Sequence, residues 1–314
     1  MRRTDNVADG SQTPVVRREV SLSMNALPDC FHYPAEELPV RSPVPVLVLE
    51  DANALHAHFA RAIADEIASN TAAGRVTRLI LPVGPVGHYP LLAEICNLEQ
   101  ISWQNCHVFF MDEYCDWQGR CVPSEHPLSF RGFAQRTLFD RLDRAIALPA
   151  AQLHFPDPLQ IDRISAEINA VGGVDTCYGG IGIHGHVAFN EAPTSRWTQV
   201  TLAEFKSSKT RLLPLAEETI VMNGSRAAAG FFPALPPMAV TLGMADILAA
   251  RRVRLYCQGG VWQRAILRIA LFGSPRDEAV KGEDLHYPVT LLRGHGDIRI
   301  VTEQSTAQPP LPSL

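Results

Sequence analysis

Apolar residues along this chain fall into two patterns, short continuous runs and longer stretches with helical periodicity. The helical spacing predicts helices over residues 52–70, 88–100, 127–144, 161–173 and 261–273. The continuous runs predict strands over residues 44–50, 76–83, 106–114, 174–182, 253–260 and 298–303. Uniformly apolar strands that alternate with helices are typical of a parallel sheet covered on both faces. The pattern therefore predicts an α/β fold with a mostly parallel sheet.

The two ends of the chain differ in character. Residues 1–45 are polar and contain several prolines, and we interpret them as an N-terminal extension that lies mostly outside the core. Strands and helices alternate over residues 46–314 without an internal repeat, so we interpret this part as one domain. A chain of 314 residues is long enough to bury a sizeable core.

Composition excludes several classes of protein. The formal net charge of −5 does not favour a surface that binds nucleic acid. No apolar run reaches the about 18 to 20 residues of a membrane span, and the polar N-terminus does not resemble a signal peptide. Seven scattered cysteines without a CxxC motif indicate reduced thiols, because Cys115 and Cys121 lack further zinc ligands at suitable spacing. We therefore expect a cytoplasmic protein.

Three polar clusters follow predicted strands directly. They are PVGPVG at residues 82–87, MDEY at residues 111–114 and GIGIHGH at residues 180–186. Ligands of such sheets bind at the carboxyl ends of the strands. The sequence therefore predicts a binding site at the edge where these clusters meet.

The MDEY cluster places two carboxylates at the end of a buried strand. A carboxylate such as Asp112 is partly desolvated there, which raises its pKa toward that of a useful base. The alternative is that the carboxylates cap the next turn of the chain. In the following segment we interpret Ser124 as a helix N-cap.

Two histidines, His184 and His186, follow the third strand, and Glu191 lies five residues further on. Residues i and i+2 of an extended chain share one side, so both imidazoles could face the predicted site. An imidazole moves protons near neutral pH, and a carboxylate can orient it. Two alternatives are a structural role and a metal site, although the sequence does not reveal a third metal ligand. We predict no metal and no cofactor.

The PVGPVG cluster lies where a phosphate-binding loop would lie, between a strand and a helix. Such loops bind through backbone N–H groups and a hydroxyl. Here Pro85 lacks an N–H group, and the cluster contains neither serine nor threonine. We therefore favour the interpretation of this cluster as a tight turn over that of a phosphate-binding loop.

In order along the chain, the motifs LPVGPVG, FFMDEY, SEHPLSF, GGIGIHGHVAFNEA, NGSRAAAGFF and MAVTLGMADILAA resemble those of one family. This is the glucosamine-6-phosphate deaminase family, which also includes the related 6-phosphogluconolactonases, and the resemblance covers residues 50–303. It implies a Rossmann-like α/β fold without a redox cofactor. It also implies conversion of glucosamine 6-phosphate and water to fructose 6-phosphate and ammonia.

The resemblance also implies site residues. Asp112 matches the base that moves a proton from C2 to C1, and His186 matches the histidine that opens the sugar ring. Glu191 matches the carboxylate that supports this histidine, and Arg226 matches the arginine that binds the phosphate, for which a guanidinium is well suited. His184 departs from the family, which usually has an acidic residue at this position.

Further departures concern the phosphate. The loop that includes Gly84 and Val86 lacks the family's hydroxyl, and Trp262 replaces a basic residue, although Arg264 could reach the same place. Because tryptophan packs against the apolar face of a sugar, an unphosphorylated amino sugar is an alternative substrate. A lactonase and a sugar-binding module without catalysis are further alternatives. The expected partner is a small amino sugar or sugar phosphate, and family members often form homo-oligomers.

Overall fold

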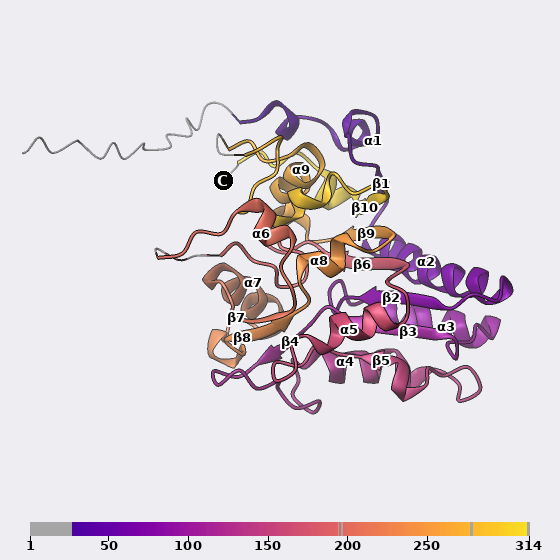
Figure 1. Ribbon diagram of the computed structural model, residues 1–314. Coiled ribbons are helices and arrows are strands. Elements are labelled where there is room, and N and C mark those ends of the chain that lie inside the picture. The colour runs from indigo at the N-terminus through magenta and orange to yellow at the C-terminus, as the bar shows by residue number, and fades with distance from the viewer. Residues whose placement is uncertain (1–26, 194, 196, 277–278, 313–314) are drawn as a thin grey trace, which may run out of the picture.

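The computed structural model describes residues 27–193, 195, 197–276 and 279–312 and contains two sheets (Figure 1). Seven strands form a wholly parallel sheet in the order β1-β10-β9-β6-β2-β3-β5, and three form an antiparallel sheet in the order β4-β8-β7. The strands are β1 (Val46–Leu49), β2 (Thr77–Leu81), β3 (Cys106–Phe110), β4 (Asp112–Cys115), β5 (Leu153–His154), β6 (Thr176–Gly180), β7 (Arg211–Pro214), β8 (Met238–Thr241), β9 (Arg252–Cys257) and β10 (Ile298–Glu303).

Helices cover both faces of the seven-stranded sheet, which confirms the predicted α/β fold. The α-helices are α1 (Leu38–Arg41), α2 (Ala52–Ala72), α3 (His88–Glu99), α4 (Phe130–Thr137), α5 (Arg163–Ala170), α6 (Leu202–Lys206), α7 (Glu217–Ala227), α8 (Met244–Leu248), α9 (Arg264–Phe272) and α10 (Gln304–Ala307). Seven short 3-10 helices complete the described structure: η1 (Asp29–Phe31), η2 (Ala35–Glu37), η3 (Phe139–Arg141), η4 (Ala150–Gln152), η5 (Phe232–Ala234), η6 (Gly260–Gln263) and η7 (Pro288–Leu292).

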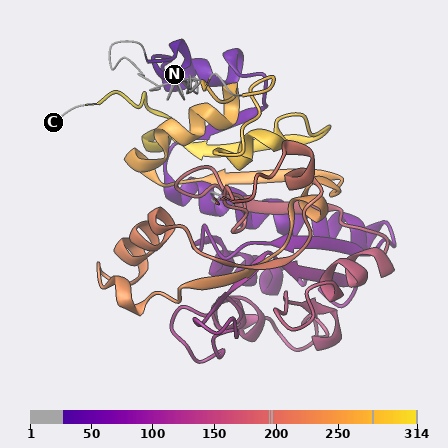
Figure 2. The same ribbon diagram turned by 60° about the vertical axis from the view of Figure 1, so that its left-hand side comes forward.

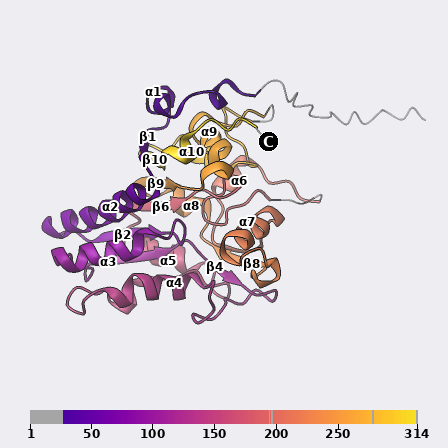
Figure 3. The same cartoon turned by 180° about the vertical axis from the view of Figure 1, so that it is seen from behind.

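Successive residues of the central strands point into two separate cores. On one face Leu79, Tyr178 and Val301 pack with α2, α3 and α4, and Figure 3 shows α2 and α3 side by side. On the other face Ile80 and Leu255 pack with α5, α8 and α9. Because both faces are buried, these strands need apolar residues at every position, which is the pattern that made them predictable.

The segment 106–114, predicted as one strand, is two strands in two different sheets. After Phe110 the chain leaves the parallel sheet, and from Asp112 it pairs antiparallel with β8, with Asp112 opposite Thr241. The strands β7 and β8, together with α7, were not predicted from the sequence. They form a smaller unit on the left of Figure 1, and Figure 2 shows this unit from another side.

Within the predicted extension, the described residues 27–45 place four buried side chains in the core. Phe31, Ala35, Leu38 and Val44 are buried in the core cluster that contains α9. The guanidinium of the buried Arg268 fixes this segment, because it donates to the carbonyls of Cys30 and Tyr33. Residues 1–26 lie outside the described residues.

One of the predicted helices has different bounds and a different N-cap. The predicted helix 127–144 is shorter, because α4 begins at Phe130 and a separate turn, η3, follows it. Its N-cap is Ser129, which accepts a hydrogen bond from the Gly132 N–H, so the expectation of a cap at Ser124 is wrong. Within the described residues, no helix combines the length and apolar character that a membrane span requires.

A column of three stacked rings joins α2, α3 and β9. The Phe59 ring lies between His88, at a centroid distance of 3.8 Å, and Tyr256, at 3.7 Å. Burial, together with the nearby His56, lowers the pKa of His88 to about 3. The native protein therefore keeps this imidazole neutral at pH values where an unfolded chain binds a proton.

We expect the substitution His88→Phe to weaken the pH dependence of stability in acid. Below an unfolded pKa of about 6.5 the unfolded chain binds a proton that native His88 does not, so acid favours unfolding. The free energy of unfolding should fall by up to about 1.4 kcal/mol per pH unit for this group as pH decreases toward 3. Urea unfolding at pH 7 and pH 5 measures the difference, which should be smaller for His88→Phe. The exposed His32→Gln should behave as wild type, and an unchanged difference in His88→Phe would contradict the assignment.

Candidate active site

A cavity of about 480 Å³ lies at the carboxyl ends of β9, β6, β2 and β3, where the three polar clusters were expected. The loops after these strands form its floor, and residues of α7 and of the segment before α4 form its walls. Six of the predicted site residues line it: Gly84, Val86, Asp112, His186, Arg226 and Trp262. Asp112 follows β3 and Trp262 follows β9. These two strands are three positions apart in the sheet, and their axes are therefore separated by roughly 14 Å.

Asp112 lines the cavity as a buried carboxyl group. Its side chain lies where the chain passes from one sheet to the other, and only 6% of the residue is exposed. Burial raises the pKa of Asp112 well above its usual range, and the adjacent Glu113 raises it further. This carboxyl group therefore retains its proton more readily than an exposed aspartate.

The neighbouring Glu113 has a different environment. Its carboxylate accepts hydrogen bonds from the Ser129 hydroxyl at 3.0 Å and from the backbone N–H groups of Tyr114, Phe130 and Arg131 at 2.9 Å. These donors include the first N–H groups of α4, so Glu113 fixes the start of that helix. The two alternatives for the MDEY carboxylates thus apply to different residues, since Glu113 is a cap and Asp112 faces the cavity.

His184, His186 and Glu191 lie together beside the cavity. The His186 Nδ1 atom lies 3.4 Å from His184 Nδ1 and 3.8 Å from a Glu191 oxygen. His184 Nε2 lies 3.9 Å from the same oxygen. The predicted proximity is present, but its geometric basis was wrong, because residues 181–186 form a turn with a positive φ at Gly185 rather than an extended strand. Of the three, only His186 lines the cavity.

Gly182 determines where the His186 ring lies. A Cβ atom built on Gly182 would lie 1.8 Å from His186 Nε2, so the imidazole occupies the space that any other residue would fill. The Gly182 N–H group also donates to the His186 carbonyl at 2.8 Å, which closes the turn. The glycine therefore has a steric function at this position.

Burial keeps the His186 imidazole neutral. Together with the nearby His184, it lowers the pKa of His186 to about 3. Burial also raises the pKa of Glu191, whose oxygens accept hydrogen bonds from the Thr219 hydroxyl at 2.5 Å and the Ala216 N–H at 2.7 Å. Glu191 is thus anchored to the start of α7, and from there it lies against both histidines.

Among the described residues, one group could hold a metal ion, and it consists of His184, His186 and Glu191. One ligand atom from each lies within 4.8 Å of the others. Nitrogen and oxygen ligands of this kind suit a first-row divalent metal. Both Glu191 oxygens, however, already accept hydrogen bonds from α7 and its N-cap. The carboxylate of Glu191 therefore has polar partners without a metal ion.

The loop of residues 82–87 lies against the end of β6. A Cβ atom on Gly180 would lie 2.5 Å from the Gly84 carbonyl oxygen, so a glycine there permits this close approach. The Gly84–Pro85 peptide bond is cis, and α3 begins directly after the loop at His88. The loop therefore lines the cavity with backbone groups and apolar side chains, among them the half-exposed Val86.

Arg226 and Trp262 meet at the opposite part of the cavity. The Arg226 guanidinium lies over the Trp262 ring, with its carbon 5.4 Å from the ring centroid. Among the described residues that line the cavity, Arg226 is the one arginine, and lysine is absent. The structure places Arg264 outside the lining, because its Nε donates to the Ser305 carbonyl at 2.9 Å. We therefore leave Arg264 out of the proposed substrate-binding set.

One face of α7 contributes residues that the sequence reasoning missed. Thr219, Met222 and Asn223 line the cavity together with Arg226. Asn223 donates to the Tyr114 hydroxyl at 3.0 Å, which joins α7 to β4. The spacing of these residues, i, i+3, i+4 and i+7, is that of one helical face and could have revealed them.

Comparison with known proteins identifies the family. Residues 50–299 match the model of the family described as glucosamine-6-phosphate isomerases/6-phosphogluconolactonase. A glucosamine-6-phosphate deaminase of Caenorhabditis elegans is 31% identical over 68% of this chain and 76% of its own length. One from Porphyromonas gingivalis is 32% identical over 72% of this chain and 78% of its own length.

Solved structures show the same fold. A monomeric glucosamine-6-phosphate deaminase superposes with a TM-score of 0.68 at 24% identity, covering 83% of this chain and 98% of that one. A 6-phosphogluconolactonase from Thermotoga maritima gives a TM-score of 0.57 at 19% identity, covering 82% and 98%. The family model and these relatives show that the chain belongs to the enzyme family of glucosamine-6-phosphate isomerases and 6-phosphogluconolactonases.

Proposed function

We propose that the protein is an amino-sugar deaminase and isomerase that converts glucosamine 6-phosphate and water to fructose 6-phosphate and ammonia. The named relatives support this substrate. The observation that carries the proposal is a buried carboxyl group, Asp112, that lines a cavity together with a neutral imidazole, His186. A sugar-binding module without catalysis would not need a desolvated base in its pocket.

Asp112 is the proposed base for proton transfer between carbon atoms. It takes the proton from C2 of the opened sugar and returns it to C1, which converts the aldose to an enolamine and then to the imine of the ketose. Water adds to that imine, and ammonia leaves. The ammonium group of the bound substrate favours the ionised form of Asp112, so binding opposes the effect of burial on its pKa.

His186 is the proposed group that opens the sugar ring. A neutral imidazole can accept the proton of the C1 hydroxyl and donate a proton to the ring oxygen. His184 and Glu191 act as positioning residues for this ring, since both lie beside it and outside the cavity. Glu191 supplies the negative charge that a protonated His186 would need during the step.

Arg226 is the proposed ligand of the phosphate, and its surroundings favour a second candidate substrate. A phosphate carries up to two negative charges, whereas the described cavity lining offers one guanidinium and a loop without hydroxyls. Trp262 provides an apolar surface beside that guanidinium. An unphosphorylated amino sugar is therefore the second candidate, with the same chemistry at C1 and C2.

We also propose that the protein is cytoplasmic and that it forms a homo-oligomer. The described cysteines, all seven of them, are free thiols, which supports a reducing compartment. The relatives support a small-molecule substrate as the partner.

We expect Asp112→Asn to abolish turnover without loss of stability. An amide cannot accept the C2 proton, so ammonia release should fall at least about 100-fold, while substrate binding persists. Glu113→Gln is the matched control, because it changes the adjacent carboxylate that caps α4. It should lower the free energy of unfolding by about 2 kcal/mol. Unchanged turnover in Asp112→Asn would remove Asp112 from the role of base.

We expect Gly182→Ala to reduce activity by displacing the His186 ring. The added methyl group needs the space of the imidazole, and a displacement of about 1 Å can cost about 100-fold in rate. Ammonia release should therefore fall at least about tenfold, while circular dichroism shows a folded protein. Gly294→Ala, at an exposed position where a Cβ atom meets no neighbour, should behave as wild type. Equal activity of both variants would show that the position of the His186 ring is unimportant.

We expect wild-type protein to release ammonia from glucosamine 6-phosphate, and Trp262→Lys to lower the KM for this substrate several-fold. The substitution adds a second cation beside Arg226. The KM for free glucosamine should not fall, and Trp117→Lys, at an exposed tryptophan outside the cavity, controls for the added charge. Release from free amino sugars alone would favour the second candidate, and no release from any would favour a lactonase or a binding module.

A further inference from the structure

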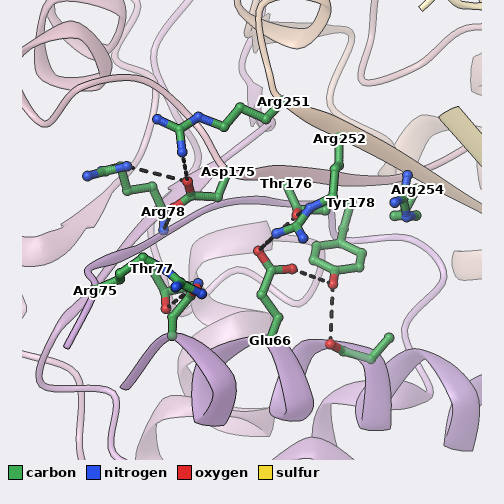
Figure 4. Close-up of polar contacts among 12 residues, drawn as sticks. Glu66, Arg75, Thr77, Arg78, Asp175, Thr176, Tyr178, Arg251, Arg252 and Arg254 are labelled. Atoms are coloured by element: carbon green, nitrogen blue, oxygen red, sulfur yellow. Dashed lines mark hydrogen bonds and ion pairs between the residues drawn. The ribbon is translucent and has the colours of Figure 1, made fainter. Parts of the chain in front are cut away.

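A second hollow lies at the amino ends of the central strands β2, β6 and β9, whereas the cavity described above lies at their carboxyl ends. Its volume is about 460 Å³, and its lining includes four arginines and two aspartates: Arg75, Arg78, Arg251, Arg252, Asp175 and Asp297. Figure 4 shows these arginines, which come from strands and from the loops before them. The strands are five or six residues long, so this hollow lies about 15 to 20 Å from the cavity described above.

One of these arginines, Arg252, is neutralised within the fold. Its guanidinium lies 2.6 Å from a Glu66 oxygen and donates to the Thr176 hydroxyl at 2.9 Å. Glu66 also accepts from the Tyr178 hydroxyl at 2.8 Å, which joins α2 to β6 and β9. Asp297 is neutralised in the same way, because it pairs at 2.8 Å with Arg254, which does not line the hollow. These pairs account for part of the cluster as structural contacts.

To balance the charges of the other three arginines, the lining contains one further carboxylate, that of Asp175. Arg78 and Arg251 both approach the same oxygen of the buried Asp175, at 3.4 and 3.2 Å, as the dashed lines in Figure 4 mark. Arg75 is oriented by Asn70, an uncharged amide, whose oxygen accepts two hydrogen bonds from its guanidinium at 3.2 and 2.9 Å. Within the described residues the mouth of the hollow thus carries an excess of two positive charges, in a chain whose net charge is −5.

Like charges gathered in one hollow repel one another unless an anion joins them. Guanidinium groups bind oxyanions through two parallel N–H donors, so arginines that converge are well suited to a phosphoryl group. Arg251 retains donors that face solvent, because 69% of its side chain is exposed and its ion pair with Asp175 uses one nitrogen. Asn70 and Asp175 fix the directions of the other two guanidinium groups in advance of binding.

We propose that this hollow is an anion site, separate from the catalytic cavity, in which Arg75, Arg78 and Arg251 bind the phosphoryl group of a small ligand. The volume admits either inorganic phosphate or a phosphorylated sugar. Both present the same chemistry to the arginines. The residues that would bind the phosphoryl group lie outside the catalytic cavity, so this proposal does not depend on the substrate proposed above.

The test is phosphate binding by the full chain, with the catalytic cavity weakened by Arg226→Gln. Isothermal titration uses inorganic phosphate, glucosamine 6-phosphate and sodium chloride at equal ionic strength. The double variant Arg75→Gln/Arg251→Gln changes two exposed arginines at the mouth, so its fold should persist. Arg163→Gln/Arg299→Gln removes two exposed arginines elsewhere and is the matched control.

We expect saturable phosphate binding that weakens at least tenfold in Arg75→Gln/Arg251→Gln and less than twofold in the control. Binding of phosphate and sugar phosphate with equal strength would mean that the phosphoryl group alone is recognised. Stronger binding of the sugar phosphate would mean that the hollow also contacts the sugar. Equal binding by both double variants, or no saturable binding beyond that of chloride, would overturn the proposal.

Discussion

The change of sheet between Phe110 and Asp112 is the constraint on which the rest of the site depends. At this junction the Met111 carbonyl accepts from the Leu242 N–H at 2.7 Å, so the antiparallel sheet is fixed to the end of β3. The same junction reaches the loop after β6, because the Asn190 amide donates to the Leu242 carbonyl at 2.8 Å. The carboxyl group and the histidine loop are therefore positioned by one set of hydrogen bonds at Leu242 rather than by each other.

Burial acts in opposite directions on the two groups at the centre of the cavity. It favours the protonated form of Asp112 and the unprotonated form of His186, and each of these forms is neutral. A neutral pair avoids the desolvation cost of burying an ion pair. In the proposed reaction, the substrate brings the charge that the chemistry needs, because its ammonium group would bind beside these two groups.

The sequence predicted the parallel sheet well, because burial on both faces leaves a local signal in each strand. The antiparallel sheet left no such signal, since β7 alternates between partly buried and exposed residues and its pairing with β8 is decided by distant parts of the chain. The site was predictable where residues follow strands, as for Asp112 and His186. It was not predictable for Arg264, because the direction of a side chain at a helix start depends on contacts such as that with Ser305.

The contact between Gly182 and His186 has a consequence for how this chain can evolve. The imidazole fills the space beside the glycine, so a larger residue at position 182 becomes tolerable only after the histidine has changed. After both residues have changed, a histidine restored at position 186 would clash with the larger side chain at position 182. Two substitutions would then have to revert together, so the loss of this site would be close to irreversible.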